Sequence, residues 1–243
     1  MQINNPLEKF GLKDVISVFS SRQDGNMSLC YGNVNESLES RRKFLSAVGI
    51  DYHNLIFAKQ VHGNNVAYVT ENNKGSGALD FNSSVSDRDG FLTDKKNVPI
   101  AILTADCLSV FIYDPAIPAV GILHAGWRST EKNICGQGVR QMQGRFGSRP
   151  EELLIGFGPS IRSCCCKMEN GFKSNFPFGL INRGADIYMD IALINSKQLE
   201  DCGVKKDNIF DPKRCTFSKN QDFFSFRKEA DASGRMISVI MLK

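Results

Sequence analysis

The sequence predicts an α+β protein with α/β-type layers, in which mixed β-sheets lie centrally and helices flank them. Three observations lead to this fold class. Several predicted strands are apolar on both faces, which indicates burial between layers. Strands and helices are mixed along the chain but do not alternate as regular βαβ units. The 243 residues contain no linker or repeat, so we expect a single domain spanning 1–243.

The first part of the chain predicts one long helix after a strand. The apolar stretch 14–22 predicts the strand. A helix is expected over 35–49, with Asn35 as its N-cap and Gly49 as its stop.

The middle of the chain predicts most of the buried strands. Residues 55–70 predict two short strands around a Gly-Asn-Asn turn, and the polar stretch 71–89 predicts a loop. A long strand is expected over 98–114, apolar on both faces, and a second buried strand over 119–127.

The C-terminal part predicts two helices and two strands. Apolar residues at i+4 spacing place a helix over 134–146, which Gly147 ends. A strand is expected over 153–161, an amphipathic helix over 187–203 and the last strand over 235–242.

Composition excludes several functional classes. A net charge of +4 with scattered Lys and Arg is too small to indicate a nucleic-acid partner. The N-terminal residues do not resemble a signal peptide, and no apolar run approaches the ~20 residues that span a membrane. We therefore expect a cytoplasmic protein without a membrane partner. The eight cysteines are expected to be reduced, and the run 164–166 is interpreted as small buried residues, with metal binding or redox chemistry as the alternative.

Polar side chains interrupt the two buried strands of the middle region. Asp106 and Cys107 lie inside the first strand, and His124 ends the second, shortly before Gly126. A buried polar group is costly unless it is paired or bound to a ligand. Because neighbours on a strand point to opposite faces, Asp106 and Cys107 reach one site only if a bulge or a strand end intervenes.

Three side chains form a candidate metal site. His62 also ends a short apolar strand, before Gly63, so it shares the context of His124. His62, Cys107 and His124 together offer the donor atoms that zinc prefers. A catalytic zinc site has three protein ligands and keeps a fourth position for water.

Six motifs in order cover nearly the whole chain. They are QVHGNNV from Gln60, DRDGFLT from Asp87, TADCLSVFIYD from Thr104, GILHAGWRS from Gly121, GFGPSI from Gly156, and FFSFRKEADASGRMISVIML from Phe223. With these motifs the chain resembles the YfiH family, also called the laccase-domain or polyphenol oxidase family, the peptidoglycan-editing factor family, or the purine nucleoside phosphorylase family. The resemblance implies a catalytic domain of the CNF1/YfiH-like fold, with a zinc site made by His62, Cys107 and His124.

The resemblance also implies activities. These are phosphorolysis of adenosine, inosine, guanosine and methylthioadenosine, adenosine deamination, and a link to peptidoglycan editing, the removal of muropeptide precursors in which Ser replaces Ala. The laccase name implies copper-dependent phenol oxidation. The chain departs from the family pattern after GPSI, where an aromatic residue, Glu and an aliphatic residue are replaced by Cys166, Lys167 and Met168.

We expect a small-molecule enzyme that uses a purine nucleoside and phosphate. Asp106, Cys107 and His124 are the expected catalytic residues, with Asp106 or Asp89 moving protons. Gln60, Asp89 and Arg128 are expected to contact the substrate. Arg128 lies at the start of a predicted helix, where a cation and free N–H groups attract phosphate; a structural ion pair is its alternative.

Other functions stay open. Copper fits less well than zinc, because a multicopper cluster needs more than three histidines and sixteen residues separate Cys107 from His124. Cys107 and His124 as a nucleophile–base pair would instead hydrolyse an amide of a muropeptide precursor. A binding protein without catalytic activity would hold the metal but turn over no nucleoside.

Overall fold

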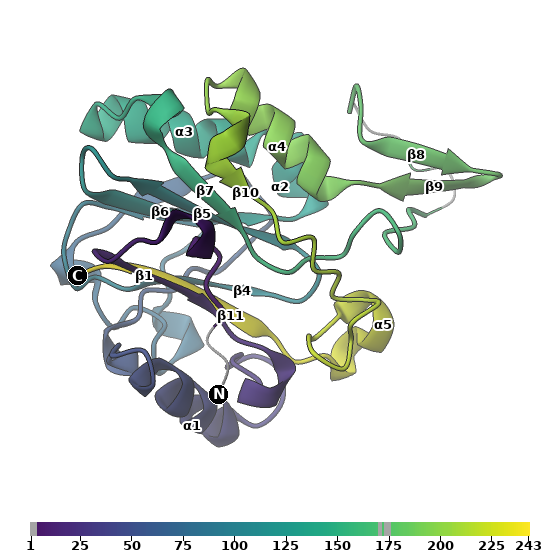
Figure 1. Ribbon diagram of the computed structural model, residues 1–243. Helices are drawn as coiled ribbons and strands as arrows, with labels where there is room; N and C mark the ends of the chain where they lie inside the picture. Colours follow the sequence, from purple (N-terminus) through teal and green to yellow (C-terminus); the bar gives the residue numbers. More distant parts are fainter. Residues whose placement is uncertain (1–3, 170–171, 173–175) are drawn as a thin grey trace.

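The computed structural model describes residues 4–169, 172 and 176–243, and within these residues the strands form two stacked sheets and a separate hairpin (Figure 1). The smaller sheet is antiparallel and has the order β1 (Val15–Phe19), β11 (Met236–Leu242), β4 (Ile100–Thr104). The larger, mixed sheet has the order β10 (Ile209–Phe210), β7 (Leu154–Phe157), β5 (Leu108–Asp114), β6 (Ala119–Ala125), β3 (Gly90–Thr93), β2 (Val66–Tyr68). The hairpin consists of β8 (Leu180–Arg183) and β9 (Asp186–Met189).

Helices cover the outer faces of both sheets (Figure 1). The helix α1 (Val34–Ser46) packs on the smaller sheet, whereas α3 (Ile134–Phe146) and α4 (Ile191–Asp201) pack on the larger one. Two more α-helices in the described part of the chain are short: α2 (Trp127–Glu131) follows β6, and α5 (Phe226–Glu229) lies before β11. The layers are therefore helix, sheet, sheet, helix, which confirms the predicted fold class.

Strand β5 shows why the central strands are apolar on both faces. Val110 and Ile112 belong to the core under α3 and α4, and Phe111 and Tyr113 belong to the core between the sheets. All seven residues of β5, of β6 and of β11 are buried. Strands enclosed by layers on both sides remove apolar surface from water at every position, which stabilises the fold by roughly 25 cal/mol per Å².

The predicted long strand over 98–114 is wrong in one respect. It consists of β4 and β5, which belong to different sheets, and residues 105–107 form a bend between them. Asp106 in this bend has a φ of 95°, a conformation that non-glycine residues adopt rarely. The apolar pattern continues on both sides of the bend, so it does not reveal the change of sheet.

Other element boundaries also differ from the prediction. Helix α1 begins earlier than expected because Asn33, not Asn35, accepts the capping hydrogen bonds from the backbone. The predicted helix over 187–203 begins only at Ile191, where the Asp190 side chain caps α4, and the residues before it form β9. Residues 55–70 contain only β2 as a regular strand. In the described part of the chain, no helix is long and apolar enough to span a bilayer.

Candidate metal centre

The bend between β4 and β5 brings Cys107 to the two histidines of the predicted trio. His62 lies in the turn before β2, and His124 lies near the end of β6. The Cys107 Sγ is 3.8 Å from His62 Nε2, and the centroids of the two imidazole rings are 4.8 Å apart. One donor atom from each of the three residues lies within 4.8 Å of the others. Segments far apart in sequence thus place three metal-binding side chains at one point.

Asp89 holds both histidines in position. Its carboxylate, 0% exposed, accepts hydrogen bonds from the backbone N–H groups of Val61, His62 and Gly63 at 3.2, 2.9 and 2.7 Å. Successive N–H groups around an anion form a stable binding concavity. The same carboxylate lies 2.9 Å from Nδ1 of His124. An Nδ1–H that donates to a carboxylate leaves Nε2 free to bind a metal, as in many metal sites.

Gly126 forms one wall of the site. A Cβ atom added to it would lie 2.8 Å from Cδ2 of His62 and 3.0 Å from Sγ of Cys107. Its φ of −74° is open to any residue, so the backbone conformation does not require glycine. The close approach of the His62 ring and the Cys107 thiol is the reason that no side chain fits here.

The electrostatics of the trio favour a thiolate. Burial raises the pKa of the Cys107 thiol, but His124 and His62 outweigh burial and lower this pKa to about 6. Burial lowers the pKa of His124, whereas Cys107 and Asp89 raise it to about 9. The thiolate is the form of cysteine that binds metals.

The donor set fits a metal ion. A tetrahedral zinc ion with Zn–S of about 2.3 Å and Zn–N of about 2.0–2.1 Å holds sulfur and nitrogen about 3.6 Å apart. The observed separation of 3.8 Å between Cys107 Sγ and His62 Nε2 is close to this value. Copper also uses two His and one Cys, so the donor set alone does not choose between the two metals.

The Asp106 side chain bonds to the C-terminal part of the chain. One of its oxygens accepts a hydrogen bond from Oγ1 of Thr216 and the other from the backbone N–H of Arg227, both at 2.6 Å. These contacts hold the strained bend that carries Cys107. They give Asp106 a positioning role, and its catalytic role stays a prediction.

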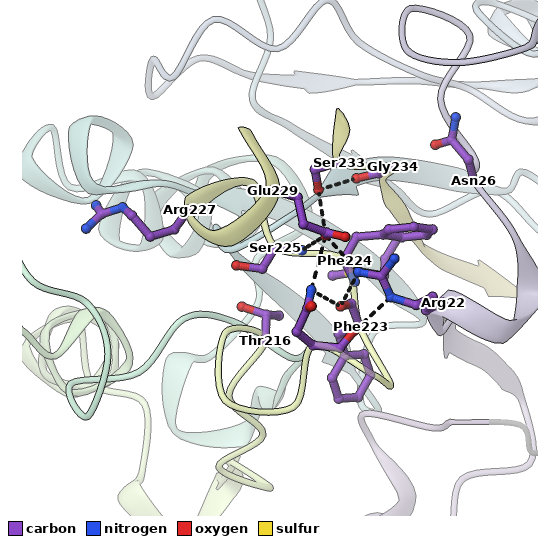
Figure 2. A network of polar contacts seen from close by, with 12 residues as sticks. Arg22, Asn26, Thr216, Phe223, Phe224, Ser225, Arg227, Glu229, Ser233 and Gly234 are labelled. Carbon is purple, nitrogen blue, oxygen red and sulfur yellow. Dashed lines mark hydrogen bonds and ion pairs between the residues drawn. The ribbon is translucent and has the colours of Figure 1, made fainter. Parts of the chain in front are cut away.

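A network around Glu229 holds the segment that donates to Asp106 (Figure 2). The Glu229 carboxylate accepts hydrogen bonds from Arg22 at 2.7 Å, from Asn220 at 3.1 Å and from the backbone N–H of Ser225 at 3.1 Å. We did not predict this role for Glu229. The available signal was the motif from Phe223, in which Ser225 and Glu229 precede the predicted last strand.

The Gln60 side chain bonds to the backbone of a neighbouring strand. Its amide donates to the backbone oxygen of Leu103 at 2.9 Å and accepts from the Leu103 N–H at 2.8 Å. This pair of hydrogen bonds ties the segment before His62 to β4, the strand that leads into the bend. Asp89, the second residue expected at the substrate, is also fully engaged by the protein, as described above.

Arg128 is exposed, so its guanidinium is accessible to a ligand from solvent. Its guanidinium carbon lies 4.3 Å from the centroid of the Trp127 ring. Among the residues that the structure describes, no carboxylate pairs with Arg128, so the alternative of a structural ion pair has no support.

Comparisons with known proteins show which family, sequences and structures the chain is similar to. A family model described as "Multi-copper polyphenol oxidoreductase laccase" matches residues 18–243. The purine nucleoside phosphorylase YlmD of Bacillus subtilis is 29% identical over 249 residues, which cover 95% of this chain and 90% of the relative. The enzyme of the same name from Geobacillus stearothermophilus is 30% identical, over 88% of this chain and 82% of the relative. The chain in the crystal structure of the Bacillus licheniformis hypothetical protein YfiH is 28% identical in sequence to this one. The two structures superpose with a TM-score of 0.89 over 94% of this chain and 93% of that chain. The resemblance stated from the motifs is confirmed.

Proposed function

We propose that this chain, which belongs to the family described as multi-copper polyphenol oxidoreductase laccase, is a zinc-dependent purine nucleoside phosphorylase. One observation carries the proposal: His62, Cys107 and His124 converge on one point, and His62 and Cys107 are only partly buried, so a small molecule can reach them. Relatives across nearly the whole chain are named purine nucleoside phosphorylase.

Zinc agrees better than copper with the residues present. The chain has three histidines, and His53 is exposed and bonded to Asp51 at 2.8 Å. Two imidazoles do not suffice for a multicopper cluster. When bound, the ion would supply Lewis acidity to a ligand in its open coordination position.

The chain's own residues divide the remaining work. Asp89 holds the His62 turn and fixes the proton on Nδ1 of His124. Arg128, exposed and stacked on Trp127, would bind phosphate through its planar pair of N–H donors. The substrates that we propose are adenosine, inosine, guanosine and methylthioadenosine, with adenosine deamination as a further reaction and peptidoglycan editing as the biological setting. All eight cysteines are free, which supports work in the reducing cytoplasm.

A cysteine hydrolase is the second candidate, because Asp89, His124 and Cys107 are also arranged in space like the acid, base and nucleophile of a catalytic triad. Asp89 contacts Nδ1 of His124, and the Cys107 thiol lies within 4.8 Å of the His124 donor atom. In this case Cys107 would attack an amide carbonyl, such as that of a muropeptide precursor.

One experiment separates the candidates. Protein purified without a chelator is analysed for metal and then assayed on the nucleosides with and without phosphate. The proposal expects base release that needs phosphate, and a loss of both one metal equivalent and this activity in Cys107→Ser. The variant Cys30→Ser, which changes an exposed cysteine outside the trio, is the matched control. Ammonia release without phosphate would identify deamination. Activity that survives complete removal of the metal, together with alkylation of Cys107 by iodoacetamide, would favour the hydrolase.

A further inference from the structure

Three thiols form a second cluster that the proposed function does not use. Cys164 and Cys165 lie in the turn after β7, and Cys215 lies in the segment between β10 and α5. The Cys164 Sγ is 3.6 Å from the Cys215 Sγ and 3.4 Å from the Cys165 Sγ. All three sulfur atoms lie within 4.8 Å of one another, and none of the three forms a disulfide. The expected role of the run 164–166 as small buried residues therefore holds for Cys166 but not for Cys164, which is exposed.

The backbone brings the two segments together without help from the thiols. Ser160 donates to the carbonyl of Arg214 and accepts from the N–H of Thr216, both at 3.1 Å. The Arg162 guanidinium makes two hydrogen bonds to the Asp211 carboxylate, at 2.8 and 2.6 Å. Arg162 is 8% exposed, so its guanidinium is largely shielded from solvent, whereas Asp211 is partly exposed. The thiols are thus preorganised, which lowers the entropy cost of binding a shared ligand.

The chemistry of the cluster selects a particular class of ligand. Three sulfur donors without an oxygen donor favour soft cations such as Cu⁺ and Zn²⁺ over Mg²⁺ or Ca²⁺. A tetrahedral zinc ion with Zn–S of about 2.3 Å holds its sulfur atoms about 3.8 Å apart. The observed 3.4 and 3.6 Å require only small shifts.

We infer that Cys164, Cys165 and Cys215 form a second metal site, which binds one thiophilic cation, Zn²⁺ or Cu⁺, and leaves a coordination position open to solvent. The ion would join two segments about fifty residues apart that both hold the bend of the first site. Ile161 donates its N–H to the Asp106 carbonyl, and Thr216, next to Cys215, donates to the Asp106 carboxylate. Binding at the second site therefore stabilises the segments around the bend that carries Cys107.

The test uses the full chain, reduced and handled without oxygen. The background is Cys107→Ser, which removes the thiolate of the first site. Zn²⁺ is titrated against a chromogenic chelator, and Cu⁺ is titrated in a separate arm. We expect one tightly bound equivalent in this background, and none after the further change Cys164→Ser or Cys215→Ser. Adding Cys30→Ser or Cys202→Ser instead should leave the equivalent in place, and the cation should raise the melting temperature only when the three-thiol cluster is intact.

Several outcomes would overturn this inference. The inference is wrong if the Cys107→Ser protein binds neither Zn²⁺ nor Cu⁺. It is also wrong if adding Cys164→Ser does not lower the number of cations bound per chain. Because Cys164 is exposed, its replacement by serine should not disturb folding, which keeps the test decisive if Cys215→Ser unfolds. A titration that finds six rather than eight thiols in the denatured, metal-stripped protein would instead indicate a disulfide in the cluster. The single variant Cys164→Ser keeps Cys107, so its metal content and nucleoside activity report on the first site.

Discussion

Replacing Asp89 by Asn tests whether this carboxylate, rather than the three ligands alone, creates the first metal site. Each oxygen of Asp89 serves two donors. One accepts from the His62 N–H and lies next to Nδ1 of His124, and the other accepts from the N–H groups of Val61 and Gly63. An Asn side chain has one oxygen and one NH₂ group. In either orientation, its NH₂ therefore faces two donors.

The two orientations of the Asn amide in the Asp89→Asn protein weaken the site in different ways. If the NH₂ group faces Val61 and Gly63, two buried N–H groups lose their acceptor, at about 1–3 kcal/mol each, or roughly 2–6 kcal/mol of unfolding free energy. If the NH₂ group faces His124, it favours the tautomer with the proton on Nε2, which blocks the metal-binding nitrogen. Loss of an outer partner of a ligand typically lowers metal affinity by about 10- to 100-fold, or ~1.4–2.7 kcal/mol.

The assay is chelator competition for zinc, together with thermal unfolding in the presence of a chelator. Asp114→Asn is the matched control, because Asp114 is 1% exposed and only its Oδ1 accepts hydrogen bonds, from the N–H groups of Ala116 and Ile117. Its Oδ2 makes no hydrogen bond within the described part of the chain, so Asn keeps the existing contacts. The control should bind zinc normally. An Asp89→Asn protein with zinc affinity within about twofold of the wild type would refute our account of the site.

Three further predictions concern single residues near the site. Asp106→Asn should keep most of the activity, because Asn tolerates positive φ and its amide can bond both Thr216 and the Arg227 N–H. A stable but inactive variant would instead support the predicted catalytic role. Gly126→Ala should weaken zinc binding by at least about tenfold, measured by chelator competition, and lower the free energy of unfolding by about 1–3 kcal/mol, because the added Cβ meets His62 and Cys107. A normal zinc affinity would contradict this reasoning. Arg128→Lys should lower phosphate-dependent turnover by roughly tenfold or more while the zinc content and the melting temperature stay unchanged. The control Arg145→Lys changes another exposed Arg that stacks on an aromatic ring and should not lower turnover. Equal effects of the two changes would make Arg128 merely a surface charge.

Local patterns predicted the central strands and the main helices well. Burial on both faces leaves a nearly continuous apolar run, as in 119–127, and this signal needs no knowledge of neighbouring segments. Boundaries were less certain where one side chain decides them. Asn33 begins α1 and Asp190 begins α4 because their side chains accept hydrogen bonds from backbone N–H groups. For α1, Asn35 lies two residues further along and is the same residue type, so the local pattern favoured it as the cap.

The predicted metal trio depended on context within short segments. His62 and His124 each end an apolar stretch before a small residue, and Cys107 interrupts a buried run. Residue type and local position together therefore predicted these three ligands. Their convergence in space is a different matter. It requires the break at Asp106, which the pattern over 98–114 does not show, and this break also explains how Asp106 and Cys107 avoid opposite faces of one strand.

By itself, the sequence determined the layered fold class, the buried strands and the identity of the three candidate ligands, because periodicity and the cost of burying polar groups act locally. Only the tertiary structure decided the roles of Asp89, Asp106 and Gly126, and only it joined Cys215 to Cys164 and Cys165. Each of these roles depends on a contact between segments distant in sequence. A hydrogen bond to a backbone N–H, or the space left for a missing Cβ, exists only after the sheets have stacked, and no periodic pattern encodes it.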